Sequence, residues 1–536
     1  MRNIAAIFAI VLAAFSIGSS AQNLPFSVEL EEFTIPGMPA VQSFAWAQHN
    51  GKWLLIGGRT DGLHQRQPFA AFLDADNNTV ISVIDPETQQ VWQSDMLDLP
   101  VNLQEQLKST NMNFTQVDET LYIIGGYGFS ATAGDHITHA ALITVNVPAI
   151  IDHIISASSI TEDFEITENA FFANTGGHLA YLNNKFYLCG GQYFEGRYNP
   201  MGPDHGPGFI QNYADAVHVF NLNFQNSEWQ IQNVQTFSDS EILHRRDYNL
   251  IPQIFEDGSN GLVMFSGVFQ PNVDLPWHSN VKVTESSYQL IPDFEQLLSQ
   301  YHSARIPIYS ESNNEQYNLF FGGISRYYYN ENNQLMDDPN VPFVTTISAS
   351  VRNSDGTWSE FKIGDMPELL GASSEFIPAA NMDMLLDEII KYDVLPEEQI
   401  LLGYIVGGIE SSEPNIFFIN DGAQSVASTK IYKVYIHPGN VGLNELAVTN
   451  IQELRARVFP NPVLDSTTLE FHIPISGEVE ITLLTSKGET VNVLYSGNQM
   501  AGDCTFELDL GAIAAGDYFV QIQSPVAKSS VRIIKK

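Results

Sequence analysis

One stretch of the chain, residues 192–209, holds the densest set of side chains that could bind or transform a polar ligand. It contains carboxylates, an arginine, a histidine, an amide and aromatic rings, among them Gln192, Glu195, Arg197, Tyr198 and His205. Aromatic faces beside carboxylates and amides are typical of sugar binding, although the same groups equally often anchor loops. Four glycines and three prolines in the stretch favour a fixed loop. Because long loops on a rigid scaffold often carry function, we predict that this loop contacts a ligand.

Metal chemistry is not favoured by the remaining carboxylates. Asp74, Asp76 and Asn78, with Asp85 at the twelfth place, have part of the spacing of a calcium loop. Thr79 stands where the sharp turn of such a loop requires glycine, and Asp85 is better explained by the turn that it opens. The chain has no zinc-type spacing of cysteine and histidine and no nucleophile motif. We therefore predict no metal and no cofactor.

A recurring pattern marks the elements that must position the candidate residues. Six short apolar runs each end in a glycine pair or a near-copy of one: Gly57-Gly58, Gly125-Gly126, Gly190-Gly191, Ser266-Gly267, Gly322-Gly323 and Gly407-Gly408. The pairs lie between 56 residues (266 to 322) and 85 residues (322 to 407) apart. Units of this length have room for four strands and their loops, which is the size of a propeller blade.

Turn residues divide each unit into hairpins. His49-Asn50-Gly51 separates two apolar runs before the first glycine pair, and Asn183-Asn184 does so before the third. Asparagine and glycine tolerate the positive φ that a tight hairpin turn requires. Strand, turn, strand and glycine pair, followed by a second hairpin, resemble the kelch repeat over about residues 26–437. The resemblance implies an all-β, six-bladed propeller within residues 22–437. The last unit ends with Thr429–Ile436, one strand short of a blade. Phe26–Phe33 alternates apolar and polar residues and is expected to supply the missing strand, which closes the ring.

The kelch resemblance also implies where a ligand binds, namely at one mouth of the central channel. The residues implied follow the glycine pairs or stand near the starts of first strands: Arg59, Tyr127, Gln192, His178, Arg245, Arg246, His302 and Arg305. Arginine offers a planar fork that matches a carboxylate, and the other groups suit sugar hydroxyls. For any one of them, a structural contact between blades is the more common role.

Three apolar segments interrupt the strands and have a helix-like pattern. They are Val101–Lys108, Phe294–Tyr301 and Met382–Tyr392. We expect them in loops on one face of the disc.

Both ends of the chain indicate export. Residues 1–21 read as a signal peptide with cleavage between Ala21 and Gln22, and its apolar run is too short to span a bilayer comfortably. Residues 438–455 are the predicted linker. Residues 456–536 alternate as short strands of a small β-sandwich, opening with Phe459-Pro460-Asn461-Pro462 and ending in a basic tail. This unit resembles the type A sorting domain of the type IX secretion system of Bacteroidetes.

The sorting-domain resemblance implies a partner and a location. It implies recognition of residues 456–536 by the type IX machinery, then release from the cell or attachment to its surface. The net charge of −38 argues against nucleic acid and anionic membranes as partners. No further segment is long and apolar enough to span a membrane, and Cys189 and Cys504 lie in different predicted domains, so no disulfide is expected. We expect a monomer.

Two hypotheses for function follow. The first is a binding module for glycans or another extracellular macromolecule, favoured by the export signals, the aromatic and polar loops and the missing nucleophile. The alternative is an enzyme acting on small acidic sugars, because exported sialate mutarotases resemble this chain in being six-bladed kelch proteins. In that case the acid–base and carboxylate-binding candidates are Arg59, Arg197, His205, Glu195 and Arg245.

Overall fold

A computed structural model describes residues 24–202, 206, 208–330, 332–439, 454, 456–473, 477–485, 490–500, 502–524 and 528–536. The chain divides into two compact units, Met1–Ala447 and Val448–Lys536. The predicted signal peptide with its cleavage site, and most of the predicted linker, lie outside the described residues.

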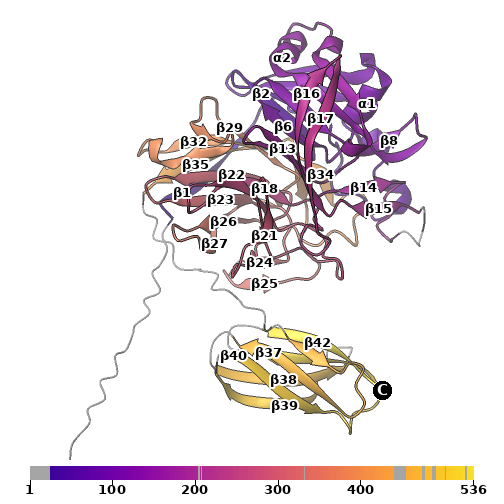
Figure 1. Ribbon diagram of the computed structural model, residues 1–536, viewed down its shortest axis with the longest axis vertical. Helices are drawn as coiled ribbons and strands as arrows, with labels where there is room; N and C mark the ends of the chain where they lie inside the picture. Colours follow the sequence, from indigo (N-terminus) through magenta and orange to yellow (C-terminus); the bar gives the residue numbers. More distant parts are fainter. Residues whose placement is uncertain are drawn as a thin grey trace, which may run out of the picture. The chain divides into compact units, whose positions relative to one another are not determined.

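The first unit is an all-β propeller of six four-stranded antiparallel blades, as predicted (Figure 1). Blade one has β2 (Ala45–His49), β3 (Lys52–Ile56), β4 (Val80–Asp85) and β5 (Gln90–Asp95). Blade two has β6 (Asn113–Val117), β7 (Thr120–Ile124), β10 (Ala141–Asn146) and β11 (Phe164–Glu168). Blade three has β12 (His178–Leu182), β13 (Lys185–Cys189), β16 (Ala216–Gln225) and β17 (Glu228–Ser238). Blade four has β18 (Asn249–Ile254), β19 (Asn260–Phe265), β20 (Val281–Val283) and β21 (Tyr288–Leu290). Blade five has β22 (Ala304–Ser310), β23 (Glu315–Phe321), β26 (Thr346–Arg352) and β27 (Trp358–Asp365).

The sixth blade is built from both ends of the propeller. Its strands are β29 (Glu375–Pro378), β32 (Ile400–Val406), β35 (Ile431–Pro438) and β1 (Phe26–Phe33). β1 pairs with β35 in one unbroken antiparallel register, from Phe26 opposite Pro438 to Phe33 opposite Ile431, and Figure 1 shows the two strands side by side. The pairing leaves no open edge between the first and last units.

The glycine pairs hold each blade against the chain that begins the next one. Gly57 and Gly125 have φ values of +70° and +67°, and a Cβ there would lie 2.4 Å from Leu107 O and 1.8 Å from Asn174 O. Only a residue without a side chain fits such a position. In four of the pairs the second glycine also donates its N–H to that neighbouring chain, as Gly126 does to Asn174 O at 3.0 Å.

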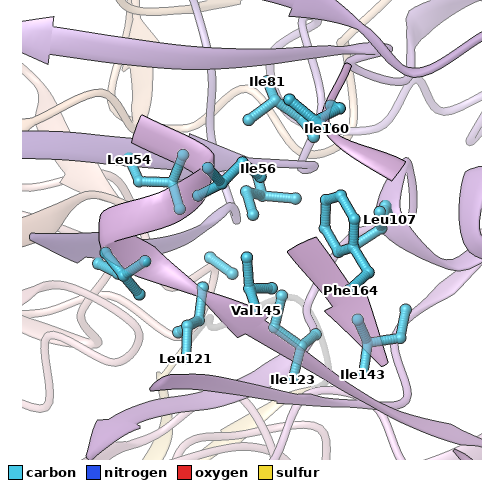
Figure 2. Packing of buried hydrophobic residues seen from close by; sticks show 14 of the residues in the cluster. Leu54, Ile56, Ile81, Leu107, Leu121, Ile123, Ile143, Val145, Ile160 and Phe164 are labelled. Carbon is cyan, nitrogen blue, oxygen red and sulfur yellow. The ribbon is translucent and has the colours of Figure 1, made fainter. Parts of the chain in front are cut away.

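Apolar residues fill the space between neighbouring blades. Figure 2 shows the cluster between blades one and two, where Leu54 and Ile56 of β3 meet Ile123 of β7 and Val145 of β10. These strands are buried on both faces and therefore read in sequence as short continuous apolar runs.

The three segments predicted to be helix-like have different structures. Val101–Leu107 is a helix, α1, whereas Phe294–Tyr301 is irregular and Met382–Tyr392 contains a hairpin of β30 (Met384–Leu385) and β31 (Ile389–Lys391). Near the end of the irregular segment, the buried Gln300 amide donates to Gly322 O at 3.0 Å, which fixes the backbone by tertiary contacts. The β-branched run Ile389-Ile390 instead joins the free edge of β22. A helix that the sequence did not predict, α2 (Val147–Ile155), covers the core of Figure 2.

The prediction that these segments share one face is also wrong. The first two lie in connections between blades, on the side of the disc that carries the glycine pairs. The 382–392 segment joins β29 to β32 and therefore lies on the opposite side, with the tight hairpin turns.

The second unit is a small β-sandwich. One sheet has β36 (Arg457–Phe459), β37 (Ser466–Ile473) and β40 (Gly502–Asp509), and the other has β39 (Thr490–Gln499), β38 (Gly477–Thr485), β41 (Gly516–Gln523) and β42 (Lys528–Lys535). Leu469 and Phe471 of the first sheet pack with Ile481, Val520 and Ile522 of the second.

Candidate functional site

The first strand of every blade lies beside the central channel of the propeller. These inner strands are β2, β6, β12, β18, β22 and β29, and contacts join them in this order from β2 to β29. Each inner strand begins on the side of the glycine pairs and ends at a hairpin turn, so the channel has a glycine-pair end and a turn end.

A ring of six residues, here named the collar, surrounds the channel at the glycine-pair end. Each stands two residues before the first residue of its inner strand and has a φ between +48° and +66°. The six are Ser43, Asn111, Gly176, Asp247, His302 and Ser373. Backbone N–H to C=O hydrogen bonds join five of the six neighbouring pairs of these described residues, for example Asn111 N to Ser43 O at 3.3 Å and Asp247 N to Gly176 O at 2.7 Å. The left-handed backbone lets every unit reach the next one in the same way.

A cavity of about 330 Å³ fills the channel below the collar. Its walls combine aromatic rings, carboxylates and one arginine. The residues used below are Trp46, Phe114, Asp118, His178, Asp247, His302, Arg305, Glu375, Asp387 and Glu388. The volume is that of a small-molecule site.

Arg305 is the basic side chain that projects into this cavity. Its Nε donates to Leu250 O at 2.9 Å, and its Nη1 lies 4.0 Å from Glu375 Oε2, which is too far for a hydrogen bond. Within the described part of the chain, the remaining N–H groups of this guanidinium have no hydrogen-bond partner. They are therefore available to a ligand in the cavity.

Glu375 is the most buried carboxyl group of the cavity, at 8% exposure. It accepts a hydrogen bond from Trp46 Nε1 at 3.3 Å. Burial raises its pKa to about 7, although Arg305 and the Trp46 bond act in the opposite direction. A carboxyl group with such a pKa can both donate and accept a proton near neutrality.

Glu388 reaches the cavity from the 382–392 hairpin, here named the strap. Glu388 is exposed to solvent on one side, yet the protein packed around its carboxyl group raises its pKa, and Arg305 offsets part of this effect. The two histidines in the cavity wall are held by other groups. His178 Nε2 lies 2.6 Å from Tyr248 O and His302 Nδ1 lies 3.3 Å from Ser373 Oγ, and burial lowers the pKa of both, so that both are neutral at pH 7.

A second polar group lies at the collar, around Arg246. The guanidinium pairs with Asp247 and donates from Nε to Tyr213 Oη at 3.1 Å. Its charge also acts on the hydroxyls of Tyr198 and Tyr301, whose pKa values burial raises. Tyr127 lies farther out and is buried, with its hydroxyl donating to Gly196 O at 2.8 Å.

Two of the arginines expected at the mouth are occupied by structural contacts. Arg59 is buried, pairs with both carboxylate oxygens of Asp61 at 2.7 and 2.8 Å, and donates to Asn77 Oδ1 at 2.9 Å. Arg245 is fully buried, donates to three backbone carbonyls and lies over the ring of Trp277. In both cases the donors hold loops together, which explains why they do not face the cavity.

The 192–209 stretch is less of a free loop than the sequence indicated. Gln192 and Glu195 bound a strand, β14 (Gln192–Glu195), which pairs with β15 (Ile210–Tyr213) and bridges to β9 (Asp135–Thr138) of a small sheet beside blade two. Glu195 is exposed and accepts from Tyr193 Oη, and Arg197 donates to Phe69 O at 3.0 Å. His205 lies outside the described residues. None of these described side chains lines the cavity.

The structure thus brings together His178, His302 and Arg305, and adds Glu375, Glu388 and Trp46, which sequence reasoning missed. A signal for Glu375 was present, because it occupies the same place in its repeat as His178, two residues after the collar. Trp46 likewise occupies the place of Arg305, three residues after the collar. The described residues contain no group of three or more histidines, cysteines or carboxylates arranged to hold a metal. In the same part of the chain, no helix has the length and apolarity to cross a membrane.

Comparison with known proteins identifies the second unit. Residues 457–536 match the secretion system C-terminal sorting domain. The protein is therefore an exported one of the Bacteroidetes type, secreted or attached to the cell surface, and this domain interacts with the type IX secretion machinery.

No curated protein matches the chain, and the solved structures that resemble it share little sequence with it. The structure of YjhT is 11% identical with a TM-score of 0.40, covering 74% of this chain and 96% of that one. A glycoside hydrolase family 43 arabinoxylan arabinofuranohydrolase from Bacillus subtilis is 10% identical with a TM-score of 0.25, covering 93% and 92%. Similarities of this strength carry no information on function.

Proposed function

We propose that this protein is an exported kelch-type propeller that binds a saccharide-sized molecule in its channel cavity. The kelch assignment is supported by the glycine pair or its near-copy that ends the second strand of all six blades. Export is supplied by the sorting domain, so the ligand is one met outside the cell.

The observation that carries the proposal is the state of Arg305. The Arg305 side chain is 21% exposed, and the N–H groups that the protein leaves unpaired face the cavity, where the oxygen atoms of a ligand can accept from them. Arg59 and Arg245 show how this chain treats arginines that serve the fold, since their donors are satisfied by the protein itself.

The walls of the cavity suit a saccharide. Trp46 and Phe114, whose ring centroids lie 6.5 Å apart, offer apolar faces beside the carboxyl group of Glu375. Sugars combine an apolar ring face with hydroxyls that both donate and accept hydrogen bonds. A cavity of about 330 Å³ fits a monosaccharide or the end of a glycan, so the macromolecular alternative requires a chain end that enters the channel.

Calorimetric titration with neutral, acidic and amino monosaccharides and their short oligomers tests this function. We expect at least one to bind, and Arg305→Met to weaken that binding about tenfold or more, because a charge-assisted hydrogen bond is lost. Arg457→Met is the matched control, since this arginine is exposed on the sorting domain. Equal affinity of the Arg305→Met variant and the control would refute the proposal.

An enzyme is the second candidate, and the near-neutral pKa of Glu375 favours it. A carboxyl group that exchanges protons at pH 7 beside a bound sugar could promote anomer exchange. NMR of sialic acid with and without the protein measures this rate directly. An unchanged exchange rate would exclude the mutarotase alternative and leave the binding function.

A further inference from the structure

The strap contributes to the cavity wall as a hairpin inserted between β29 and β32, outside the regular four strands of the blades. β31 joins β22 in parallel, with Ile390 opposite Ile308 and Lys391 opposite Tyr309. The Tyr392 hydroxyl donates to Pro25 O at 2.6 Å, just before β1. The strap is therefore fixed to blade five and to the start of the closing strand, and it presents Glu388 to the channel from the turn end.

The strap changes the charge of the cavity. Arg305 faces one carboxyl group, Glu375, and Asp247 already pairs with Arg246 outside the cavity. Glu388 makes no side-chain hydrogen bond or ion pair within the described residues, and its neighbour Asp387 also lines the cavity. One guanidinium therefore stands against more than one carboxyl group. Asp118, in the hairpin turn of blade two, adds one carboxyl group to the wall, and the strap adds two.

We propose that the strap makes the cavity selective for a saccharide-sized ligand that carries a protonated amine, and that Glu388 is the residue that determines this selectivity. This inference rests on the function proposed above. An ammonium group carries a positive charge and three hydrogen-bond donors. The carboxylate of Glu388 and the second oxygen of Glu375 accept no hydrogen bond from the described residues, so both are free to accept from such a group. The aromatic face of Trp46 in the same wall adds a further attraction for a cation.

An anionic ligand fits these charges less well. Its negative group could reach Arg305, but it would then compete with Glu375 and lie in the same cavity as Glu388 and Asp387. Like charges close together disfavour the binding of such a ligand, although Glu388 and Asp387 are exposed and water screens part of the repulsion. The strap therefore acts against acidic sugars as well as in favour of basic ones.

D-Glucose and three derivatives, each of which differs from it at a single carbon (C2 or C6), test the selectivity. Calorimetry with the purified full protein would compare D-glucose, D-glucosamine, N-acetyl-D-glucosamine and D-glucuronate at a pH where the free amine is protonated. We expect D-glucosamine to bind about tenfold or more tighter than D-glucose, and D-glucuronate to bind most weakly. N-acetyl-D-glucosamine separates the effect of charge from that of size, and should resemble D-glucose or bind more weakly.

A pair of matched variants assigns the effect to the strap. Glu388→Gln should bring the affinity for D-glucosamine within about twofold of that for D-glucose. Glu195→Gln, an exposed carboxylate outside the cavity, should keep the full preference. Thermal unfolding of both variants verifies that they fold.

The outcomes separate saccharide binding itself from the selectivity for an amine. If none of the four sugars binds, the proposed function fails for this ligand class and the inference fails with it. If D-glucose binds as well as D-glucosamine, if D-glucuronate binds most tightly, or if Glu388→Gln keeps the preference, the function stands and the inference is wrong.

Discussion

Replacing Glu375 by glutamine should stabilise the propeller by an amount that grows with pH. The carboxyl group is 8% exposed, and burial raises its pKa from 4.5 to about 7. The folded state therefore binds this proton more tightly than the unfolded state does, so the wild-type protein loses stability as the pH rises from about 4.5 to about 7. Above that range the loss is complete and constant.

The magnitude follows from the pKa. At about 1.36 kcal/mol for each pH unit, the penalty reaches about 3 kcal/mol at neutral pH and is small at pH 4.5. Glutamine has no charge to desolvate, and its side-chain oxygen can still accept from Trp46 Nε1. Arg305 and Glu388 are the titratable groups that act on Glu375, and both remain in the variant.

Chemical denaturation of the wild type and of Glu375→Gln at pH 5 and pH 8 measures the effect. We expect the variant to be more stable by about 1–3 kcal/mol at pH 8 and nearly equal to the wild type at pH 5. The exposed Glu195→Gln variant should show no such difference at either pH. A stability difference that does not change with pH would refute the assignment of a buried, proton-binding carboxyl group in the channel.

Three further predictions concern the fold. Glu360 is buried in blade five, accepts from Leu297 N and Leu298 N, and has a pKa raised to about 8 by burial, so Glu360→Gln should also stabilise the protein at pH 8 without changing sugar affinity in calorimetry. Gly125→Ala should destabilise by about 3 kcal/mol or more in thermal unfolding, whereas Gly134→Ala, at a similar φ of +74° in open space, should cost only about 1 kcal/mol. Equal costs would mean that backbone strain alone, and no contact between blades, explains the glycine pairs. Deleting residues 24–33 should expose the edge of β35 and cause dimers or aggregates in size-exclusion chromatography, and a monomer of unchanged stability would contradict the role of β1.

The repeat pattern made the architecture predictable. Gly57, Gly125 and their equivalents each fill a place where a Cβ would clash with the next blade, so local sequence reports a tertiary contact. The alternation of Phe26–Phe33 and the missing strand of the last unit also pointed to the sixth blade as it is built. By contrast, α2 follows Asn146, an N-cap whose signal is too short to stand out in a chain rich in apolar runs.

The candidate site was less predictable because its members come both from places in the repeat and from the inserted strap. Arg305 and His178 were found from their places in the repeat, but Arg59 and Arg245 share those types of place and face into the protein. Only the partners of a guanidinium separate the two cases, and partners such as Asp61 or Ser279 O are set by tertiary structure. Glu388 could not be assigned at all, since its segment read as a helix and reaches the channel by pairing with another blade.

The pairing of Phe26 with Pro438 brings the two ends of the propeller together. Gly439 N donates to Pro25 O at 2.8 Å, so the chain enters and leaves the propeller at one point, on the turn side of the disc. The strap reaches the channel from this same side, whereas the collar lies at the opposite end of the channel. A small molecule that enters past the collar therefore reaches the cavity without passing the point where the two chain ends of the propeller meet.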